Sequence, residues 1–373
     1  MSASVAAGLK SRSLAAQTVE SGKRDQKHVD TKESTLNSQL LGRAAVAPAR
    51  AVEPQVFWCP DLVSTRDLGP AGVGAVMNLA QIMKARPVDF RKALAGKQMV
   101  MFFEKPSLRT RLTFEAGMAS MGGTTMFVDQ TQERLDARET LSDVAHNLER
   151  WVDLIVLRTF SEQTIEGMAQ HAHVPVVNAL SDLEHPCQGL ADYFTLMERF
   201  GDVKNICLAY VGDGNNVAHS LLLTCACLGS SIRLATPAGY APKAEIVAAA
   251  QEIAEETGAQ IELLTDPHQA VAGADAIYTD AWVSMGQERE TEERTRIFPP
   301  YQVNEDLMGE AAPHAGFMHC LPAHRGLEVT DAVMDSERSL IFEQAENRLH
   351  AQKAILYLLL SGGDRLPARS VHA

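Results

Sequence analysis

Residues 97–123 read "KQMVMFFEKPSLRTRLTFEAGMASMGG", an apolar run that passes through a polar turn into a helix with an apolar stripe. The run at 98–103 predicts a short buried strand, and Ser107 predicts the cap of the helix. Arg109 and Arg111 then lie at the helix N-terminus, where the helix dipole disfavours positive charge. A bound phosphate or carboxylate would explain them, because free helix amides and guanidinium groups bind anions. A plain serine cap, with arginines paired to surface acids, is the alternative.

Short apolar runs alternate with helical patterns along the rest of the chain from residue 56. This alternation predicts βαβ units, and hence parallel sheets covered by helices. About nine strands fit two three-layer α/β domains better than one sheet, with the segment at 184–201 as the helix that joins them. Further helices are predicted at 139–151 and 240–257. The predicted strands lie at 98–103, 153–158, 174–178, 205–212, 231–236, 260–264, 275–279, 316–320 and 339–342.

The chain of 373 residues is 46% hydrophobic and 22% charged, with a net charge of −13. Residues 1–55 hold eight Lys or Arg against five Asp or Glu, which leaves 26 against 42, a net of −16, for the remainder. An acidic body argues against a nucleic-acid partner, and the longest apolar runs are far shorter than a membrane span. An anionic substrate would therefore have to be met by a local cluster of arginines.

The six cysteines have no spacing typical of a disulfide framework, which predicts free thiols in a reducing compartment. Cys225 and Cys227 form a C-x-C pair inside an apolar helical pattern, and no further His or Cys accompanies them. We expect both to be small core residues rather than metal ligands.

Residues 1–55 mix Ala, Ser, Lys, Arg and Gln without a sustained apolar period, so they are predicted to be a disordered N-terminal extension. Their first 19 residues lack acids and carry Lys10 and Arg12, which is weakly similar to an organellar transit peptide. The acids from Glu20 onward argue against that interpretation. The segment has no continuous apolar region typical of a secretory signal.

Polar or glycine-bearing loops follow most of the predicted strands. In parallel α/β sheets ligands bind at this edge, so these loops predict a binding site. Arg158 ends one strand and could close on the same anion as Arg109. His185 begins the joining helix, with Gln188 about one turn later, although a histidine before proline is often structural. The loops read "EKPSLRTR", "RTF", "ALSDLEHPCQ", "GDGNN", "TDAWVSMG" and "HCLPAHRG".

Two of these loops suggest recognition of an amino acid. Asp280 with Ser284 and Met285 offers an acid, a hydroxyl and turn amides, which suit an ammonium and a carboxylate. Cys320 ends a strand where its thiol could contact a substrate, although a cysteine there can also be a small buried residue.

The loop "GDGNN" at 212–216 also raises the possibility of dinucleotide binding, because Gly212 and Gly214 lie between a strand and a helix. The fingerprint requires a third glycine, where this chain has Val217, and an acid about 20 residues later that is absent here. These departures argue against a nicotinamide-dependent dehydrogenase.

Taken together, the motifs resemble those of the aspartate/ornithine carbamoyltransferase family, and in particular its ornithine-specific members. They occur in family order over residues 56–361. The combination of "SMG" and "HCLP" is the most specific part of the resemblance. The motifs are "FEKPSLRTR", "HPCQGLADYFTL", "GDGNNVAHS", "TDAWVSMGQE" and "HCLPAHRGLEVTD…FEQAENRLHAQKA".

The resemblance implies carbamoyl transfer from carbamoyl phosphate to the δ-amine of L-ornithine, in a homotrimer or a multiple of trimers. It implies no metal and no cofactor, a location in the cytoplasm, or in an organellar matrix if residues 1–55 act as a transit peptide, and neither nucleic-acid nor membrane partners. The carbamoyl-phosphate domain would comprise residues 56–186 and 345–373, and the ornithine domain residues 187–344.

The resemblance also implies roles for individual residues. Arg109, His185, Asp280 and Cys320 would be catalytic. Ornithine would be held by Asn216, Asp280, Ser284 and Met285. Carbamoyl phosphate would be held by Ser107, Leu108, Arg109, Thr110, Arg158, His185, Gln188, Cys320, Leu321 and Arg348, with Arg134 in "QERLDARE" (132–139) reaching the site of a neighbouring subunit.

One departure from the family pattern leaves alternatives open. Leu108 stands where the family usually has threonine, so a hydroxyl donor is lost while the backbone amide remains. Since "SLRTR" also occurs in some acylornithine enzymes, an acylated ornithine or putrescine is an alternative acceptor, although "DAWVSMG" and "HCLPAHRG" match free ornithine. A catalytically silent relative would be expected to lack Arg109, His185 or Cys320, and all three are present.

Overall fold

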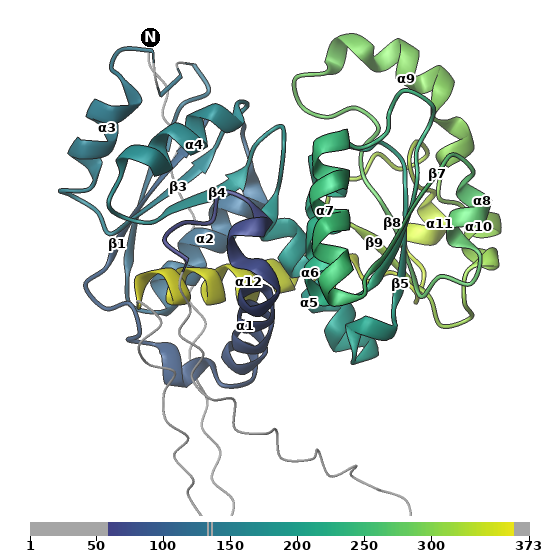
Figure 1. The fold of residues 1–373 in the computed structure, drawn as a ribbon, viewed down its shortest axis with the longest axis horizontal. Helices are drawn as coiled ribbons and strands as arrows, with labels where there is room; N and C mark the ends of the chain where they lie inside the picture. Colours follow the sequence, from purple (N-terminus) through teal and green to yellow (C-terminus); the bar gives the residue numbers. More distant parts are fainter. Residues whose placement is uncertain (1–58, 133, 136, 362–373) are drawn as a thin grey trace, which may run out of the picture. The chain divides into compact units, whose positions relative to one another are not determined.

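The computed structural model of the chain describes residues 59–132, 134–135 and 137–361, so the extension predicted at 1–55 lies outside the described residues. Within them the chain forms two parallel sheets, each flanked by helices (Figure 1). The strand order is β2-β1-β3-β4 in the first sheet and β7-β6-β5-β8-β9 in the second. The predicted fold class, two parallel-sheet α/β domains, is therefore confirmed.

The first sheet separates two layers of apolar side chains. Met99, Met101 and Phe103 pack in the core that includes α1, α5 and α12, whereas Val100 and Phe102 pack with residues of α3 and α4. Side chains on both faces of β1 are buried, which explains why residues 99–103 form an unbroken apolar run. The elements are β1 (Gln98–Phe103), β2 (Thr124–Asp129), β3 (Leu154–Arg158), β4 (Val176–Leu180), α1 (Thr65–Ala85), α2 (Leu108–Ser120), α3 (Leu141–Leu148), α4 (Glu162–His171), α5 (Pro186–Phe200) and the 3₁₀ helix η1 (Pro87–Phe90).

The second sheet also has an apolar core on each of its two faces. Leu208 and Tyr210 face the core with α6 and α7, while Ala209 and Val211 face the core with α8, α10 and α11. Its elements are β5 (Cys207–Val211), β6 (Ser231–Ala235), β7 (Gln260–Leu264), β8 (Ala276–Thr279), β9 (Gly316–His319), α6 (Asn216–Leu228), α7 (Ala244–Thr257), α8 (Pro267–Val271), α9 (Thr291–Ile297), α10 (Glu305–Glu310), α11 (Asp331–Met334) and the 3₁₀ helices η2 (Val203–Asn205), η3 (Glu288–Glu290) and η4 (Pro299–Tyr301).

Helix α12 (Ile341–Leu360), at the C-terminal end of the described chain, packs against helices of its N-terminal part. It contacts β9 of the second sheet and packs against α1, α2 and α5, and in Figure 1 it lies in yellow beside the purple α1. The residues of the first core therefore come from both ends of the described sequence. The exact domain boundaries given above stay a prediction.

Two strand assignments need correction. Residues 124–129 form β2, which was not predicted, because "TTMFVD" is a partly exposed edge strand with polar threonines and no clear apolar run. The strand predicted at 339–342 is wrong, since Ser339 makes only an isolated bridge to Phe317 and Ile341 already begins α12. A short stretch with two buried apolar residues, Leu340 and Ile341, fits either element equally well.

Cys225 and Cys227 are buried in α6, as the sequence predicted for core residues. Among the described helices, none is both long enough and apolar enough to cross a membrane.

Candidate active site

A cleft of about 1180 Å³ lies at the carboxyl ends of strands from both sheets. The loops that line it follow β1, β3 and β4 of the first sheet and β5, β6, β8 and β9 of the second. Fourteen of the predicted site residues line this cleft, and their individual roles stay predictions. They are Ser107, Leu108, Arg109, Thr110, Arg158, His185, Gln188, Asn216, Asp280, Ser284, Met285, Cys320, Leu321 and Arg348.

Arg134 does not line this cleft. It lies in the loop between β2 and α3, so the structure does not bring it together with the other predicted residues. Its predicted role in the site of a neighbouring subunit concerns a second copy of the chain.

One end of the cleft is built on the N-terminus of α2. Ser107 caps the helix, and its hydroxyl accepts a hydrogen bond of 3.2 Å from the Thr110 amide. The amides at the start of a helix have no acceptor within it, and they carry the positive end of the dipole. Arg111 turns away from the cleft, since its Nε donates to Glu115 at 2.9 Å and its guanidinium lies over the Phe127 ring. The first arginine of "RTR" thus serves the cleft, and the second does not.

Three guanidinium groups meet at this end of the cleft. Arg158 is held by a 3.1 Å hydrogen bond from its Nε to the Lys105 carbonyl, and Arg348 donates to the Thr110 hydroxyl at 2.6 Å. Burial and the charges of Arg348 and Arg109 lower the pKa of Arg158 to about 9. Within the described chain, no carboxylate forms a salt bridge with any of the three arginines. A phosphate dianion would supply the missing negative charge.

Lys105 is a further cleft residue that the sequence did not single out, although it lies within the quoted stretch. It is buried, its ammonium contacts Asp182, and it lies 4.5 Å from the centroid of the Phe160 ring. Its position two residues before the capping Ser107 is the sequence signal for this site residue. A lysine beside a helix N-terminus is as unexpected as an arginine.

His185 lies at the start of α5, and its ring lines the same end of the cleft. Burial, followed by the charges of Arg348, Arg158 and Lys105, lowers its pKa well below the usual range. The imidazole is therefore neutral at physiological pH. Its Nδ1 is buried without a hydrogen-bond partner among the described residues, so the ring can donate or accept one hydrogen bond toward a ligand.

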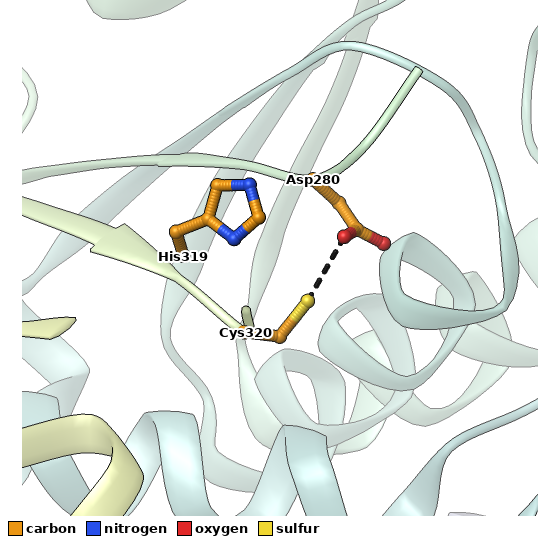
Figure 2. A group of neighbouring side chains, drawn as sticks. All are labelled: Asp280, His319 and Cys320. Atoms are coloured by element: carbon orange, nitrogen blue, oxygen red, sulfur yellow. Dashed lines mark hydrogen bonds between the residues drawn. The ribbon is translucent and has the colours of Figure 1, made fainter. Parts of the chain in front are cut away.

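The side of the cleft formed by the second sheet is built on the ends of β8 and β9. Asp280 accepts hydrogen bonds from the side-chain amide of Asn215 at 2.8 Å and from the Ala281 backbone amide at 2.8 Å. It also accepts a hydrogen bond of 2.9 Å from the Cys320 thiol, which Figure 2 shows. Burial, together with the charge of Asp280, raises the pKa of the Cys320 thiol well above its usual range. Cys320 is thus a protonated donor to Asp280 rather than a thiolate.

Asp280, Cys320 and His319 lie close enough to be considered as a metal site, because one ligand atom of each lies within 4.8 Å of the others (Figure 2). The imidazole does not fit this role. Its Nδ1 accepts the Leu321 amide at 2.9 Å, and its Nε2 lies 3.3 Å from the buried Glu328 carboxylate. With both ring nitrogens engaged and the thiol protonated, the donor set offers a metal little beyond one carboxylate.

The loop after β8 is anchored by a buried arginine. Arg294 donates to the Asp213 carboxylate at 2.8 Å and to the Trp282 carbonyl at 2.7 Å. It therefore ties the loop that carries Ser284 and Met285 to the loop after β5. This contact could not be predicted from the sequence, because Arg294 lies in a charged segment that is typical of a solvent-exposed helix.

The state of the Cys320 thiol can be tested by alkylation. With iodoacetamide we expect slow modification at pH 8, rising about tenfold per pH unit through pH 9 without a plateau, since only the thiolate reacts. Asp280→Asn removes the neighbouring charge and lowers the thiol pKa, so modification at pH 8 should become about tenfold faster. Peptide mapping by mass spectrometry would separate Cys320 from the other cysteines.

The matched control for this experiment is Asp182→Asn. Asp182 also lines the cleft, but its partner is Lys105. Its replacement should leave the alkylation rate of Cys320 unchanged. Equal rates in Asp280→Asn and in the unsubstituted protein would contradict the thiol–carboxylate contact.

Comparison with known proteins gives matches over most of the chain. The carbamoyl-phosphate-binding domain of aspartate/ornithine carbamoyltransferases matches residues 60–198, and the aspartate/ornithine-binding domain of the same family matches residues 204–359. An ornithine carbamoyltransferase from Shewanella oneidensis is 51% identical over 299 residues, which cover 80% of this chain and 99% of that protein. A Pyrococcus furiosus protein named "ornithine carbamoyltransferase, anabolic" is 47% identical over 307 residues, 81% of this chain and 96% of that one.

Solved structures agree with these matches. The ornithine carbamoyltransferase structure from Pyrococcus furiosus superposes with a TM-score of 0.80 at 46% identity, covering 83% of this chain and 100% of that one. Sequence, fold and the arrangement of the cleft thus lead to the same conclusion: the chain belongs to the aspartate/ornithine carbamoyltransferase family.

Proposed function

We propose that this chain transfers the carbamoyl group of carbamoyl phosphate to the δ-amine of L-ornithine, giving L-citrulline and phosphate. The observation that carries the proposal is that one cleft holds both groups of residues. Arg109, Arg158 and Arg348 line it on the side of the first sheet and α12, and Asp280 with Cys320 lines it on the side of the second sheet. A phosphate and an amino acid would therefore bind in the same cleft.

The amine must lose a proton before it can attack. An alkyl ammonium has a pKa near 10.4, so about one molecule in 2,500 is neutral at pH 7, and deprotonation costs about 4 to 5 kcal/mol. Asp280 is placed to accept hydrogen bonds at this end of the cleft. Because the Cys320 thiol is protonated, we assign the role of proton acceptor to Asp280, and Cys320 orients that carboxylate.

The carbamoyl carbonyl and the departing phosphate develop negative charge during the transfer. The neutral His185 ring and the three guanidinium groups already line the cleft where we place the carbonyl and the phosphate. Their dipoles and charges therefore need little reorganisation during the transfer. Leu108 contributes its backbone amide at the helix N-terminus, and its side chain is 71% exposed.

Assembly, location and pathway are parts of the same proposal. We propose a homotrimer or a multiple of trimers, supported by apolar side chains exposed on α2 and β2: Leu108, Leu112 and Met126. We further propose a cytoplasmic enzyme of arginine biosynthesis, with an organellar matrix as the alternative if residues 1–55 act as a transit peptide. Light scattering after size exclusion would measure the assembly directly.

The decisive assay compares product formation from carbamoyl phosphate with five acceptors in parallel: ornithine, acetylornithine, succinylornithine, putrescine and aspartate. We expect citrulline from ornithine and little product from the others. Preference for an acylated amine or putrescine would keep the phosphate end of the site but overturn the ornithine assignment. Absence of turnover with every acceptor would indicate a catalytically silent relative.

A further inference from the structure

A buried polar network lies behind Gln188, outside the residues that line the cleft. Asp192 is one turn after Gln188 on α5, Tyr278 is on β8, and Gln344 is on α12; all three side chains are fully buried. The network therefore joins α5 and α12 to the second sheet, directly behind Gln188. None of these three residues was predicted as a site residue.

The hydrogen bonds that lead from His319 through Gln344 and Asp192 to Gln188 have directions that are fixed by their starting point. The His319 backbone amide can only donate, and it donates to Gln344 Oε1 at 2.9 Å. The nitrogen of the Gln344 side-chain amide, Nε2, then donates to Asp192 Oδ1 at 2.7 Å. The same Asp192 oxygen receives the Gln188 Nε2 group, also at 2.7 Å. Because a carboxylate oxygen accepts, Gln188 is forced to present its nitrogen to Asp192.

This direction does not depend on the charge of Asp192. Its second oxygen, Oδ2, lies 3.0 Å from the Tyr278 hydroxyl. Burial raises the pKa of Asp192 to about 7, and a proton on Oδ2 would be donated to Tyr278. In either state Oδ1 remains the acceptor for both amides.

The consequence appears at the cleft. Gln188 lines it, and its Oε1 is buried without a hydrogen-bond partner in the described chain. An unpaired buried carbonyl oxygen is costly, so it favours a ligand that donates a hydrogen bond at that place. A ligand group that cannot donate would leave the oxygen unpaired.

We infer that Asp192 is a positioning residue that fixes the Gln188 carbonyl oxygen toward the cleft and thereby selects an acyl phosphate whose acyl group carries an N–H donor. The inference rests on the proposed function. It predicts discrimination between carbamoyl phosphate, which ends in an amino group, and acetyl phosphate, which has a methyl group of similar size in the same place.

The test measures the ratio of the dissociation constant of acetyl phosphate to that of carbamoyl phosphate in the full chain. Charge effects on the phosphate act on both ligands and cancel in the ratio. In Asp192→Asn, the new amide can donate to Gln188 Oε1 while its oxygen accepts from Tyr278, which turns Gln188 around. We expect the ratio to fall about tenfold, the usual effect of one lost buried hydrogen bond with a partner left unpaired.

A second substitution should restore the selectivity. In Asp192→Asn with Gln188→Glu, the asparagine amide donates to one glutamate oxygen, and the other oxygen faces the cleft as an acceptor. Gln344 keeps an acceptor, because its Nε2 lies 3.2 Å from the Tyr278 hydroxyl. We expect the ratio to return to within about threefold of its original value, which a merely structural role of Asp192 would not produce.

Thr195→Val is the matched control. Thr195 is buried on the same helix and is hydrogen-bonded to Asn347 at 3.1 Å, with no contact to Gln188. Its replacement should lower thermal stability and leave the ratio unchanged. An unchanged ratio in Asp192→Asn, or no recovery in the double variant, would overturn the inference. Failure of the unsubstituted chain to bind either acyl phosphate would instead contradict the proposed function.

Discussion

Replacing Arg109 with alanine is expected to lower kcat by a factor of about a hundred to a thousand. Arg109 lies at the N-terminus of α2, lines the cleft beside Arg158 and Arg348, and has no salt bridge in the described chain. Loss of one preorganised donor to developing charge typically costs about 2.7 to 4 kcal/mol in the transition state. Steady-state kinetics with saturating ornithine would measure the effect.

Arg111→Ala provides the control for this prediction. Arg111 lies two residues along the same helix, but its guanidinium contacts Glu115 and Phe127 instead of the cleft. We expect kcat to stay within about fivefold. If Arg109→Ala were as active as Arg111→Ala, the phosphate site would not lie where we place it.

Replacing Asp280 with asparagine is expected to lower kcat/KM for ornithine about a hundredfold or more. The substitution keeps the shape of the side chain but removes the charge that would contact the substrate ammonium, and loss of one partner of a buried charged pair costs about 2 to 5 kcal/mol. The affinity for carbamoyl phosphate should change by less than about twofold, because the hydrogen bonds of Asp280 in the described chain go to Asn215, Ala281 and Cys320 and not to the three arginines of the cleft.

Glu288→Gln controls for the general negative charge of this region. Glu288 also lines the cleft, and its carboxylate accepts the Gly286 amide at 2.9 Å. Since it is exposed, kcat/KM for ornithine should change by no more than about threefold. A large effect on carbamoyl phosphate binding in Asp280→Asn would show that the two ends of the cleft are not independent.

The fold was predictable from sequence where a strand carries a short apolar run. β1, which is buried on both faces, and β7, a partly exposed edge strand, both have the predicted bounds, and the parallel architecture followed from the alternation with helices. β2 could not be predicted, because "TTMFVD" begins with two polar threonines and has no clear apolar run. At 339–342 Leu340 and Ile341 are buried whereas Phe342 is exposed, and the burial of two residues does not distinguish a strand from the start of a helix.

The site was predictable where chemistry-bearing residues follow strands, because the parallel topology brings those positions to one edge. It was not predictable where function depends on contacts distant in sequence. Asp192 and Gln344 are hydrogen-bonded although 152 residues apart, and each reads as an ordinary polar residue of its helix. Lys105 and Arg294 were missed for a similar reason, since burial reveals them and the sequence pattern does not.

The return of α12 to the first sheet also has a consequence for synthesis on the ribosome. Chains emerge N-terminus first, yet Arg348, which lines the cleft, and Gln344, which contacts Asp192, lie on a helix that appears after α1, α2 and α5. The apolar surfaces of α1, α2 and α5 that contact α12 therefore stay exposed until residues 341–360 have left the exit tunnel. Nascent chains that stop short of this helix would be both inactive and prone to capture by chaperones.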